Sequence, residues 1–470
     1  MTLASAFFDE PGYVSLLYLV AFALLIFGLM GLRAPRSAVL GNRVAALGMA
    51  IALVATLLVP HLGSWWLIAL GIVLGALVGA PAARLVKMTA MPQMVALFNG
   101  VGGGAVALIS LVEFRKSGGY AGDPLYVACF SLLAALIGSI SFWGSNIAFG
   151  KLQGLLPGRP ITLGRPQEAL NALLFLAALG CGISVLAGQR DVWLMLGLLI
   201  AAALLGNAIV LPIGGADMPV VISLLNAFTG LSTAATGVAL NSTALIVAGM
   251  IVGASGSILT NEMAVAMNRS IRAIVAGGFG GVALEAASGE AGERVARATS
   301  VDDVAVQLAY ANRVVVVPGY GMAVAQAQHA VVELARLLED RGVEVEYAIH
   351  PVAGRMPGHM NVLLAEAGAP YEQLIELDEA NERFPRTDVT LVIGANDVVN
   401  PDAKNKPDSP IYGMPILDAS ASRSVVVLKR SMATGYAGVE NPLFYEPQTA
   451  MLFGDAKQSV TELTAAVKEL

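Results

Sequence analysis

The sequence Arg313-Val-Val-Val-Val-Pro-Gly319-Tyr-Gly321-Met-Ala-Val324, with the Ala- and Leu-rich run that follows it to Leu338, determines the architecture of the C-terminal third of this chain. Four consecutive valines predict a strand buried on both faces, and the run after the glycines predicts a helix. Gly-x-Gly then falls at a strand-to-helix turn, where the backbone can approach a pyrophosphate and N–H groups at the helix N-terminus can meet its charge. A structural turn without ligand remains the alternative, because Val324 stands where a third Gly or Ala is usual.

Five further strand-like runs follow this turn and alternate with helical or loop segments. Such alternation predicts a doubly wound, Rossmann-like α/β domain with a parallel sheet. A helix capped by Ser300 should open the domain, and a helix from about Lys457 should close it. The six predicted strands are 313–317, 344–349, 373–377, 389–394, 424–428 and 450–453.

Composition divides the chain into two parts. Of its 470 residues 56% are hydrophobic and 13% charged, and the mean hydropathy of +0.71 is typical of a membrane protein. Up to Arg272 there are 13 of the 28 basic and 8 of the 34 acidic residues, so the first part carries +5 and the remainder −11. We expect a transmembrane bundle over 1–272, a flexible Gly-rich linker over 273–299 and the α/β domain over 300–470. The acidity of the second part argues against a nucleic-acid partner.

Nine apolar segments are long enough to cross a bilayer. The first follows Asp9 and Glu10 without a basic residue, so it lacks the start of a cleavable signal peptide and should remain as a membrane helix. Ten basic residues flank the ends on one side of the membrane and three those on the other, which places the α/β domain in the cytoplasm and the N-terminus outside. The segments are 13–32, 38–59, 65–84, 90–112, 125–149, 168–187, 192–212, 218–239 and 243–267.

Small residues spaced four apart predict close packing between helices. Examples are Gly71, Gly75 and Gly79, and Gly249 and Gly253. Polar side chains at membrane depth are candidates for function, but asparagines also hydrogen-bond between helices and Asp217, before Met218-Pro219, also suits a helix N-cap. Cys129 and Cys181 lie in apolar runs, and no spacing of Cys, His or acids predicts a metal site. The polar candidates are Asn99, Asn146, Asn207, Asn226, Glu262 and Asp217.

Cofactor preference is normally set at the end of the second strand, where an acid binds a ribose 2′-OH. Here that strand ends in His350-Pro351, without an acid. The fifth strand instead ends in Lys429-Arg430-Ser431, which suits a 2′-phosphate, although a solvated Lys-Arg pair is the alternative. Two further loops, Gly394-Ala-Asn396-Asp397 and Thr434-Gly-Tyr436-Ala-Gly438, should lie at the carboxyl edge of the sheet, where such domains bind ligands.

These residues resemble a known family, the β subunit of proton-translocating NAD(P) transhydrogenase, over nearly the whole chain. The stretches that bear the resemblance include Gly214-Gly-Ala-Asp217-Met-Pro-Val-Val221, Ala266-Met-Asn-Arg-Ser270, Ala276-Gly-Gly-Phe-Gly280, Pro318–Gln328, His350-Pro-Val-Ala-Gly-Arg355, Pro357–Leu364, Gly394–Asp397 and Lys429–Gly438. The resemblance implies an enzyme that moves hydride from NADH to NADP⁺ as protons enter a bacterial cell across its inner membrane.

The same resemblance implies roles for individual residues. This domain would bind NADP(H), with Gly319 and Gly321 at the pyrophosphate, Arg355 and Asp397 at the nicotinamide end, and Lys429 with Arg430 at the 2′-phosphate. Tyr436 would form a lid over the cofactor. The hydride would pass directly between cofactors, so no catalytic acid, base or nucleophile is expected. The remaining cofactor-binding candidates are Tyr320, Met322, Ala323, Val324, Asn396 and Ser431.

The resemblance also implies partners and a proton path. No second Gly-x-Gly strand-turn-helix is present for NAD(H), so an α subunit of one or two chains should supply it, in a dimer of α–β units within the lipid bilayer. Proton coupling would involve Asp217, Asn226 and Asn99. Asn99 stands where some members have a histidine, which leaves the protonatable group open, since none of His61, His329, His350 and His359 lies at membrane depth.

A transporter or channel gated by a nucleotide-sensing Rossmann domain is the rival interpretation. It would need its own selectivity groups, and the helices contain no filter-like motif or charged ring.

Overall fold

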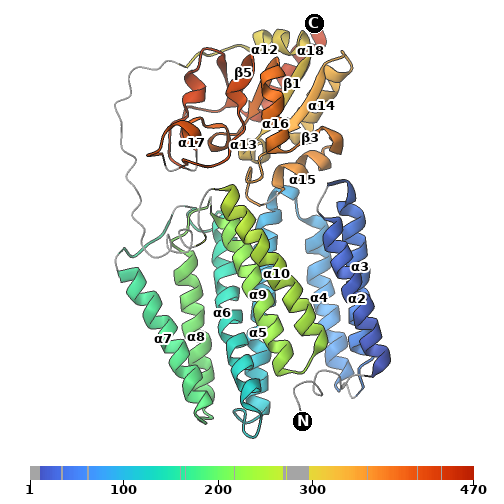
Figure 1. Cartoon of the computed structure of the whole chain (residues 1–470), viewed down its shortest axis with the longest axis vertical. Coiled ribbons are helices and arrows are strands. Elements are labelled where there is room, and N and C mark those ends of the chain that lie inside the picture. The colour runs from blue at the N-terminus through green and yellow to red at the C-terminus, as the bar shows by residue number, and fades with distance from the viewer. Residues whose placement is uncertain are drawn as a thin grey trace. The chain divides into compact units, whose positions relative to one another are not determined.

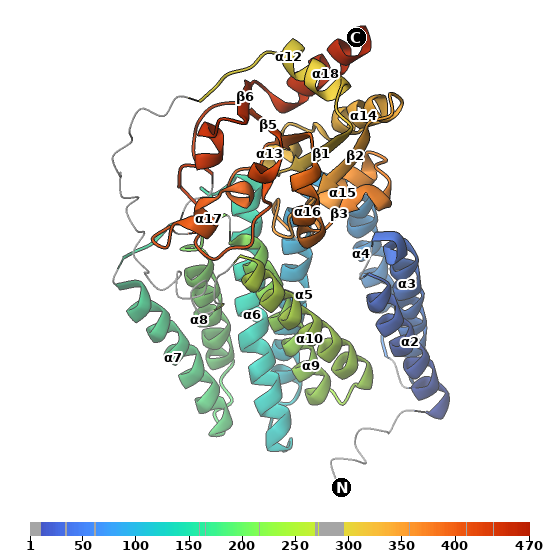
Figure 2. The same cartoon turned by 45° about the horizontal axis from the view of Figure 1, so that its top comes forward.

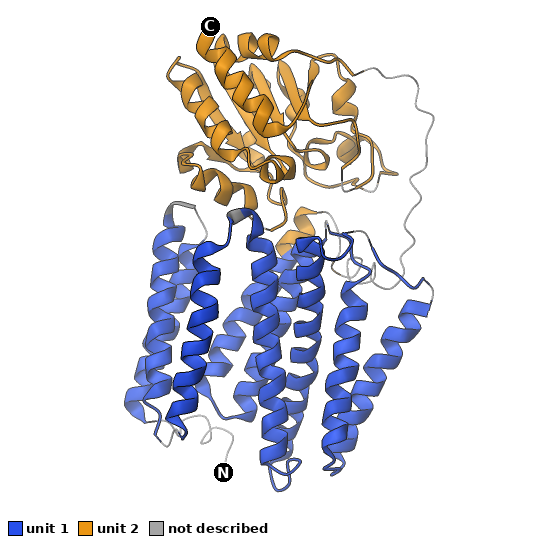
Figure 3. Ribbon diagram, turned by 180° about the vertical axis from the view of Figure 1, so that it is seen from behind, with its two compact units in different colours: residues 1–261, 272–281 blue, residues 262–271, 282–470 orange. Residues whose placement is uncertain are grey.

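The computed structural model of the chain describes residues 11–32, 35–60, 63–158, 160–164, 166–215, 217–267, 271, 296–356, 358–409, 411–435 and 437–470. The chain divides into two compact units, a helical unit and an α/β unit, which are coloured separately in Figure 3. Most of the linker expected at 273–299 lies outside the described residues. Within it, Arg297 and Thr299 exchange backbone hydrogen bonds with Met451.

The helical unit contains, among the described residues, nine helices long and apolar enough to span a bilayer, as predicted (Figure 1). The chain is therefore a multi-pass membrane protein. The helices are α2 (Gly12–Gly31), α3 (Pro35–Leu57), α4 (Trp65–Leu85), α5 (Met91–Lys116), α6 (Leu125–Gln153), α7 (Pro166–Leu186), α8 (Val192–Val210), α9 (Met218–Ala239) and α10 (Thr243–Ala266).

Glycines bring several of these helices into backbone contact. A Cβ built on Gly138 of α6 would lie 2.7 Å from the carbonyl oxygen of Gly103 on α5, and one on Gly249 of α10 would lie 2.7 Å from that of Gly230 on α9. The predicted close packing is thus confirmed for Gly249. On α4 it is wrong within this chain, because a Cβ on any of its three glycines would meet no described atom within 4 Å. These glycines are Gly71, Gly75 and Gly79.

The α/β unit is built on six parallel strands in the order β3-β2-β1-β4-β5-β6, the order of a Rossmann-like fold. All of these strands except β4 are labelled in Figure 2. In β1 every residue from Val314 to Pro318 is buried, as the four valines predicted. Its neighbours pair with it in parallel register, with Val315 opposite Glu346 on one side and Thr390 on the other. The strands are β1 (Arg313–Pro318), β2 (Glu344–Ala348), β3 (Leu374–Ile375), β4 (Val389–Ile393), β5 (Ser424–Lys429) and β6 (Thr449–Phe453).

Helices cover both faces of this sheet. On one side α12 (Val301–Ala309), α14 (Gln328–Glu339) and α18 (Ala456–Glu469) pack together. On the other, alternate residues of the central strands form a core with Phe384 that includes Val315, Val317, Val425 and Val427. The predicted cap of α12 is present, since Ser300 Oγ accepts a hydrogen bond of 3.1 Å from Asp303 N.

The helix after the glycine turn is broken rather than continuous. A short α13 (Tyr320–Val324) ends where Gln326 adopts a positive φ of 53°, and α14 starts two residues later. Ala327 N donates to Met322 O, which closes the end of α13. A left-handed Gln is uncommon, so the sequence alone predicts an unbroken helix.

Candidate functional site

The glycine turn after β1 is held against the loop after β4. Gly319 N donates to Ile393 O at 2.8 Å and Gly321 N donates to Gly394 O at 2.9 Å. A Cβ on Gly321 would lie 2.7 Å from Gly394 Cα, so a larger residue would separate the two loops. The N–H groups of both glycines are therefore used within the protein, and these glycines are needed first for contact between loops.

Three other predicted residues belong to this turn and its helix. Met322 and Ala323 are buried, with 0% and 1% of their surface exposed, so their side chains belong to the core and only their backbone can face a ligand. Val324 is 49% exposed.

The loop after β2 places Arg355 beside the turn. Its guanidinium Cζ lies 4.5 Å from the centroid of the Tyr320 ring, a cation–π contact. His359, which the sequence did not single out, holds this loop, because its Nδ1 accepts a hydrogen bond of 3.0 Å from Arg355 N. Burial and then the charge of Arg355 lower the pKa of His359 to about 4, so the ring is neutral at physiological pH.

The loops after β4 and β5 are joined by two side chains. Asp397 Oδ2 accepts from Ala437 N at 3.1 Å, and Asn441 Nδ2 donates to the backbone oxygen of Asn396 at 3.0 Å. The predicted residues Asn396 and Asp397 thus contact Asn441 and Ala437, which belong to the loop after β5. Tyr436 itself lies outside the described residues.

Two cationic side chains, Lys429 and Arg430, lie at the carboxyl end of β5. Lys429 Nζ donates to Ala433 O and lies 4.6 Å from the centroid of the Phe444 ring, while Arg430 and Ser431 are exposed. Burial lowers the pKa of Lys429, and the charge of Asp397 partly opposes this shift. No described carboxylate forms an ion pair with Lys429 or Arg430. This pair of cations therefore has the character of an anion site.

A cluster of polar side chains lies inside the helical unit, where α5, α6 and α9 meet. Asn99 Nδ2 donates to Ser145 Oγ at 2.9 Å, and Ser141 Oγ lies 2.5 Å from Thr229 Oγ1. Asn99 and Ser145 are each eight residues from the nearer end of their helices, which corresponds to about 12 Å. We call Asn99, Ser141, Ser145 and Thr229 the polar cluster. Of these the sequence indicated only Asn99.

Asn226 and Asp217 lie on the same helix as Thr229. Asn226 is half-buried one turn before Thr229, and no hydrogen bond of Asn99 reaches it. Asp217 occupies the N-cap position of α9, yet its side chain makes no capping hydrogen bond. By contrast, Asp191 Oδ1 caps α8 by accepting from Trp193 N at 3.0 Å.

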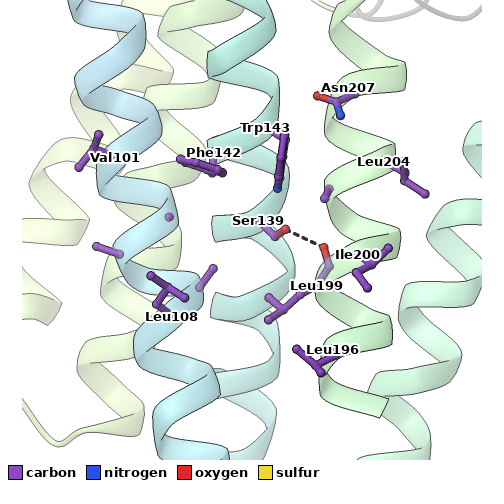
Figure 4. Close-up of a pocket in the computed structure, with 14 residues that line it drawn as sticks. Val101, Leu108, Ser139, Phe142, Trp143, Leu196, Leu199, Ile200, Leu204 and Asn207 are labelled. Atoms are coloured by element: carbon purple, nitrogen blue, oxygen red, sulfur yellow. Dashed lines mark hydrogen bonds between the residues drawn. The ribbon is translucent and has the colours of Figure 1, made fainter. Parts of the chain in front are cut away.

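An apolar cavity of about 720 Å³ lies among α5, α6 and α8 (Figure 4). Ser139, Phe142 and Trp143 of α6 line this cavity. Ser139 Oγ donates a hydrogen bond of 2.8 Å to Leu199 O. At 100° per residue Ser139 and Trp143 point about 120–160° away from Ser141 and Ser145, whereas Phe142 lies about 60° from Ser145, between the cavity and the polar cluster.

Known proteins match nearly the whole length of the chain. A family model described as NAD(P) transhydrogenase beta subunit matches residues 14–466. A protein of Rhodospirillum rubrum named NAD(P) transhydrogenase subunit beta is 49% identical over 458 residues, which cover 96% of this chain and 98% of that protein. The protein of the same name from a defined strain of that species gives the same values. With its multi-pass helical unit and Rossmann-like domain, the chain belongs to the NAD(P) transhydrogenase beta subunit family.

Proposed function

We propose that this chain binds NADP(H) in its α/β unit and exchanges hydride with NAD(H) held by a partner α subunit, while protons cross the membrane through its helical unit. In this proposal hydride passes from NADH to NADP⁺ as protons enter the cell. The observation that supports this most directly is the pair of cations Lys429 and Arg430 at the carboxyl end of β5, which forms no ion pair with a described carboxylate.

The residues of the α/β unit would bind and orient the cofactor. Lys429, Arg430 and Ser431 suit the 2′-phosphate, because a phosphate can replace the carbonyl of Ala433 as the partner of Lys429. The turn from Gly319 to Val324 would lie along the pyrophosphate. The nicotinamide supplies the hydride chemistry, so the protein needs no acid or base there. Arg355, Asn396 and Asp397 would position the nicotinamide end, and Tyr436 would cover it.

The names of the relatives, which are called subunit beta, support a partner α subunit. We assign NAD(H) to an α subunit of one or two chains, in a dimer of α–β units in the bacterial inner membrane. Residues 1–272 would translocate protons, 273–299 would connect, and 300–470 would bind NADP(H) on the cytoplasmic side. The N-terminus would lie outside.

Proton coupling would use Asp217, Asn226 and the polar cluster around Asn99. Hydroxyl groups both donate and accept hydrogen bonds, so Ser141, Ser145 and Thr229 can form part of a proton path. An amide does not titrate near neutral pH, so Asn99 would order this path rather than hold the proton. Asp217, at the start of α9, supplies a titratable carboxylate about 14 Å of helix from Asn226.

Reconstitution with the α subunit in sealed vesicles tests the proposal against a nucleotide-gated channel. NADPH and an NAD analogue with its own absorbance are added, and hydride transfer and vesicle acidification are recorded together. We expect both signals, and an uncoupler should abolish only the acidification. Ion flux that depends on NADPH binding but not on hydride transfer would establish the channel instead.

A further inference from the structure

Lys151 is a buried lysine in the last turn of α6. Only 4% of its surface is exposed, although the charge pattern of the sequence counted it among the lysines and arginines that face the cytoplasm. Its Nζ donates to the backbone oxygens of Leu211 and Ile213, the second at 2.7 Å. No described carboxylate forms an ion pair with it.

The two carbonyls that Lys151 binds belong to the end of α8 and to the loop that leads to α9. Carbonyl groups at a helix C-terminus lack partners within the helix and bear partial negative charge, so an ammonium is stabilised there. A buried charge in a membrane domain is costly unless such groups solvate it. The contact therefore satisfies both the lysine and the end of α8.

The same loop is held by backbone bonds from the connection between α6 and α7. Ile161 N donates to Leu211 O at 3.0 Å, and Gly215 N donates to Gly158 O at 2.8 Å. Leu211 O thus accepts from both Lys151 and Ile161. Lys151 therefore adds side-chain hydrogen bonds to these backbone bonds. The segment it contacts, Leu211–Asp217, is seven residues long and its last residue is Asp217.

The helix that presents Lys151 also contributes to the polar cluster. Ser145 and Ser141 lie 6 and 10 residues before Lys151 on α6, which corresponds to about 9 and 15 Å along the helix axis. Through their hydroxyl groups they contact Asn99 on α5 and Thr229 on α9. Helix α6 therefore contacts the polar cluster through Ser141 and Ser145 and the Leu211–Asp217 loop through Lys151.

We propose that Lys151 is a positioning residue that anchors the Leu211–Asp217 loop to α6, so that Asp217 keeps a fixed place relative to the polar cluster. The importance of that place for proton coupling rests on the proposed function. The anchoring itself does not, and it can be measured separately.

Two substitutions separate charge from packing. Lys151→Met keeps the length and apolar stem of the side chain but removes the charge and the donors, whereas Lys151→Arg keeps charge and donors. If Lys151 only fills space, Met should preserve function and Arg should disturb it. If it anchors the loop, the order is reversed. Lys116→Met, at the exposed end of α5, is the matched control.

The anchoring is read by cysteine labelling in the complete membrane-embedded complex. Cys129 and Cys181 are replaced by alanine, and Ile213, which is 4% exposed, is replaced by cysteine, since its backbone carbonyl remains available to Lys151. A maleimide reagent should label this cysteine about 10- to 100-fold faster in Lys151→Met, the factor for loss of a charge-assisted hydrogen bond. The parent rate should persist in Lys116→Met and in Lys151→Arg. An unchanged rate in Lys151→Met overturns the proposal.

Proton pumping gives the second measurement, made in vesicles with the α subunit present. Lys151→Met should pump about 10-fold less per hydride transferred, again from the loss of one charge-assisted contact, with NADPH affinity unchanged. Lys151→Arg should restore pumping. The double variant Lys151→Met/Asp217→Asn should lose no more than Asp217→Asn alone, because both changes affect one element. Additive losses would overturn a role that acts through Asp217.

The proposed role of Asp217 can fail independently. If Asp217→Asn pumps normally while Lys151→Met labels faster at position 213, the anchor stands and the coupling role of Asp217 is rejected. If Lys151→Met fails to assemble, Lys151→Gln, which retains a donor without charge, takes its place, and parent labelling in that variant refutes the need for charge.

Discussion

The guanidinium of Arg355 lies over the ring of Tyr320, with 4.5 Å between Cζ and the ring centroid. This contact joins the loop after β2 to the glycine turn after β1, two segments that are 35 residues apart in sequence. The neutral ring of His359 holds the loop of Arg355, because its Nδ1 accepts a hydrogen bond from the backbone N–H of Arg355. The site is therefore a set of loops that contact one another, so a substitution in one loop should shift the position of the next.

Lys429→Ala should weaken NADPH binding and leave NADH binding unchanged. The loss of one charge-assisted contact to the 2′-phosphate corresponds to roughly 1.5–3 kcal/mol, or about 10- to 100-fold in Kd. Calorimetry on a fragment from residue 290 onward checks this, with the exposed Lys406→Ala as control. Equal affinities of the parent fragment for the two nucleotides would remove the assignment to NADP(H).

The purified chain alone should not transfer hydride from NADH to an NADP analogue. The reason is that it has a single Gly-x-Gly strand-turn-helix, which the proposal assigns to NADP(H). Addition of the α subunit should restore the reaction, followed by absorbance of the analogue. Sustained turnover by the single chain would show that a second nucleotide site lies within it.

Asp217→Asn should preserve assembly and NADPH binding but remove most proton pumping and reverse transhydrogenation. An N-cap tolerates Asn at little cost, whereas a charge relay does not. At 100 mV a proton carries about 2.3 kcal/mol, so an uncoupled enzyme should lose a bias toward NADPH of roughly 40- to 50-fold. Proton pumping and reverse transhydrogenation of Asp217→Asn and the parent are compared in vesicles.

Asp191→Asn is the matched control for this experiment. Asp191 forms the capping bond that Asp217 lacks, and its replacement should leave pumping intact. Normal pumping by Asp217→Asn would direct the search for the relay to Asn99, Asn226 or the partner subunit.

The α/β unit should lose stability as pH falls from about 6.5 toward 4. In the unfolded chain His359 takes up a proton near pH 6.5, while in the folded unit its pKa is about 4, so the unfolded state binds more protons in this window. Its free energy of unfolding should therefore fall by at most about 1.4 kcal/mol per pH unit from this residue.

Urea denaturation of the fragment, followed by circular dichroism between pH 7 and 5, measures this slope. His359→Asn should reduce it by about the amount contributed by one histidine. Equal slopes for the parent and His359→Asn would show that the pKa of His359 is not lowered in the folded unit.

Local patterns predicted much of the fold. Four valines in succession indicate a strand buried on both faces, and the observed β1 agrees. The nine membrane helices follow from runs of apolar residues, with ends displaced by a few residues. The break in the helix after the glycines was not predictable, because it depends on Gln326 adopting a backbone conformation that its residue type rarely takes.

The sites were predictable only in part, because their bonds join distant segments. The partners of Gly319 and Gly321 are Ile393, at the end of β4, and Gly394, directly after it, more than 70 residues away. The burial of Lys151 depends on the end of α8, about 60 residues later. Serines in an apolar helix give no sign of which neighbour they face, so Ser141 and Ser145 became candidates only once Asn99 lay beside them.

The hydrogen bonds from Gly319 and Gly321 to the end of β4 and the residue after it have an entropic consequence. Both loops are already joined without any ligand, so the loss of backbone freedom at this turn takes place during folding rather than during nucleotide capture. Under the proposed function, a nucleotide would therefore meet a turn whose backbone is already ordered, and this turn would add little to the entropic cost of binding.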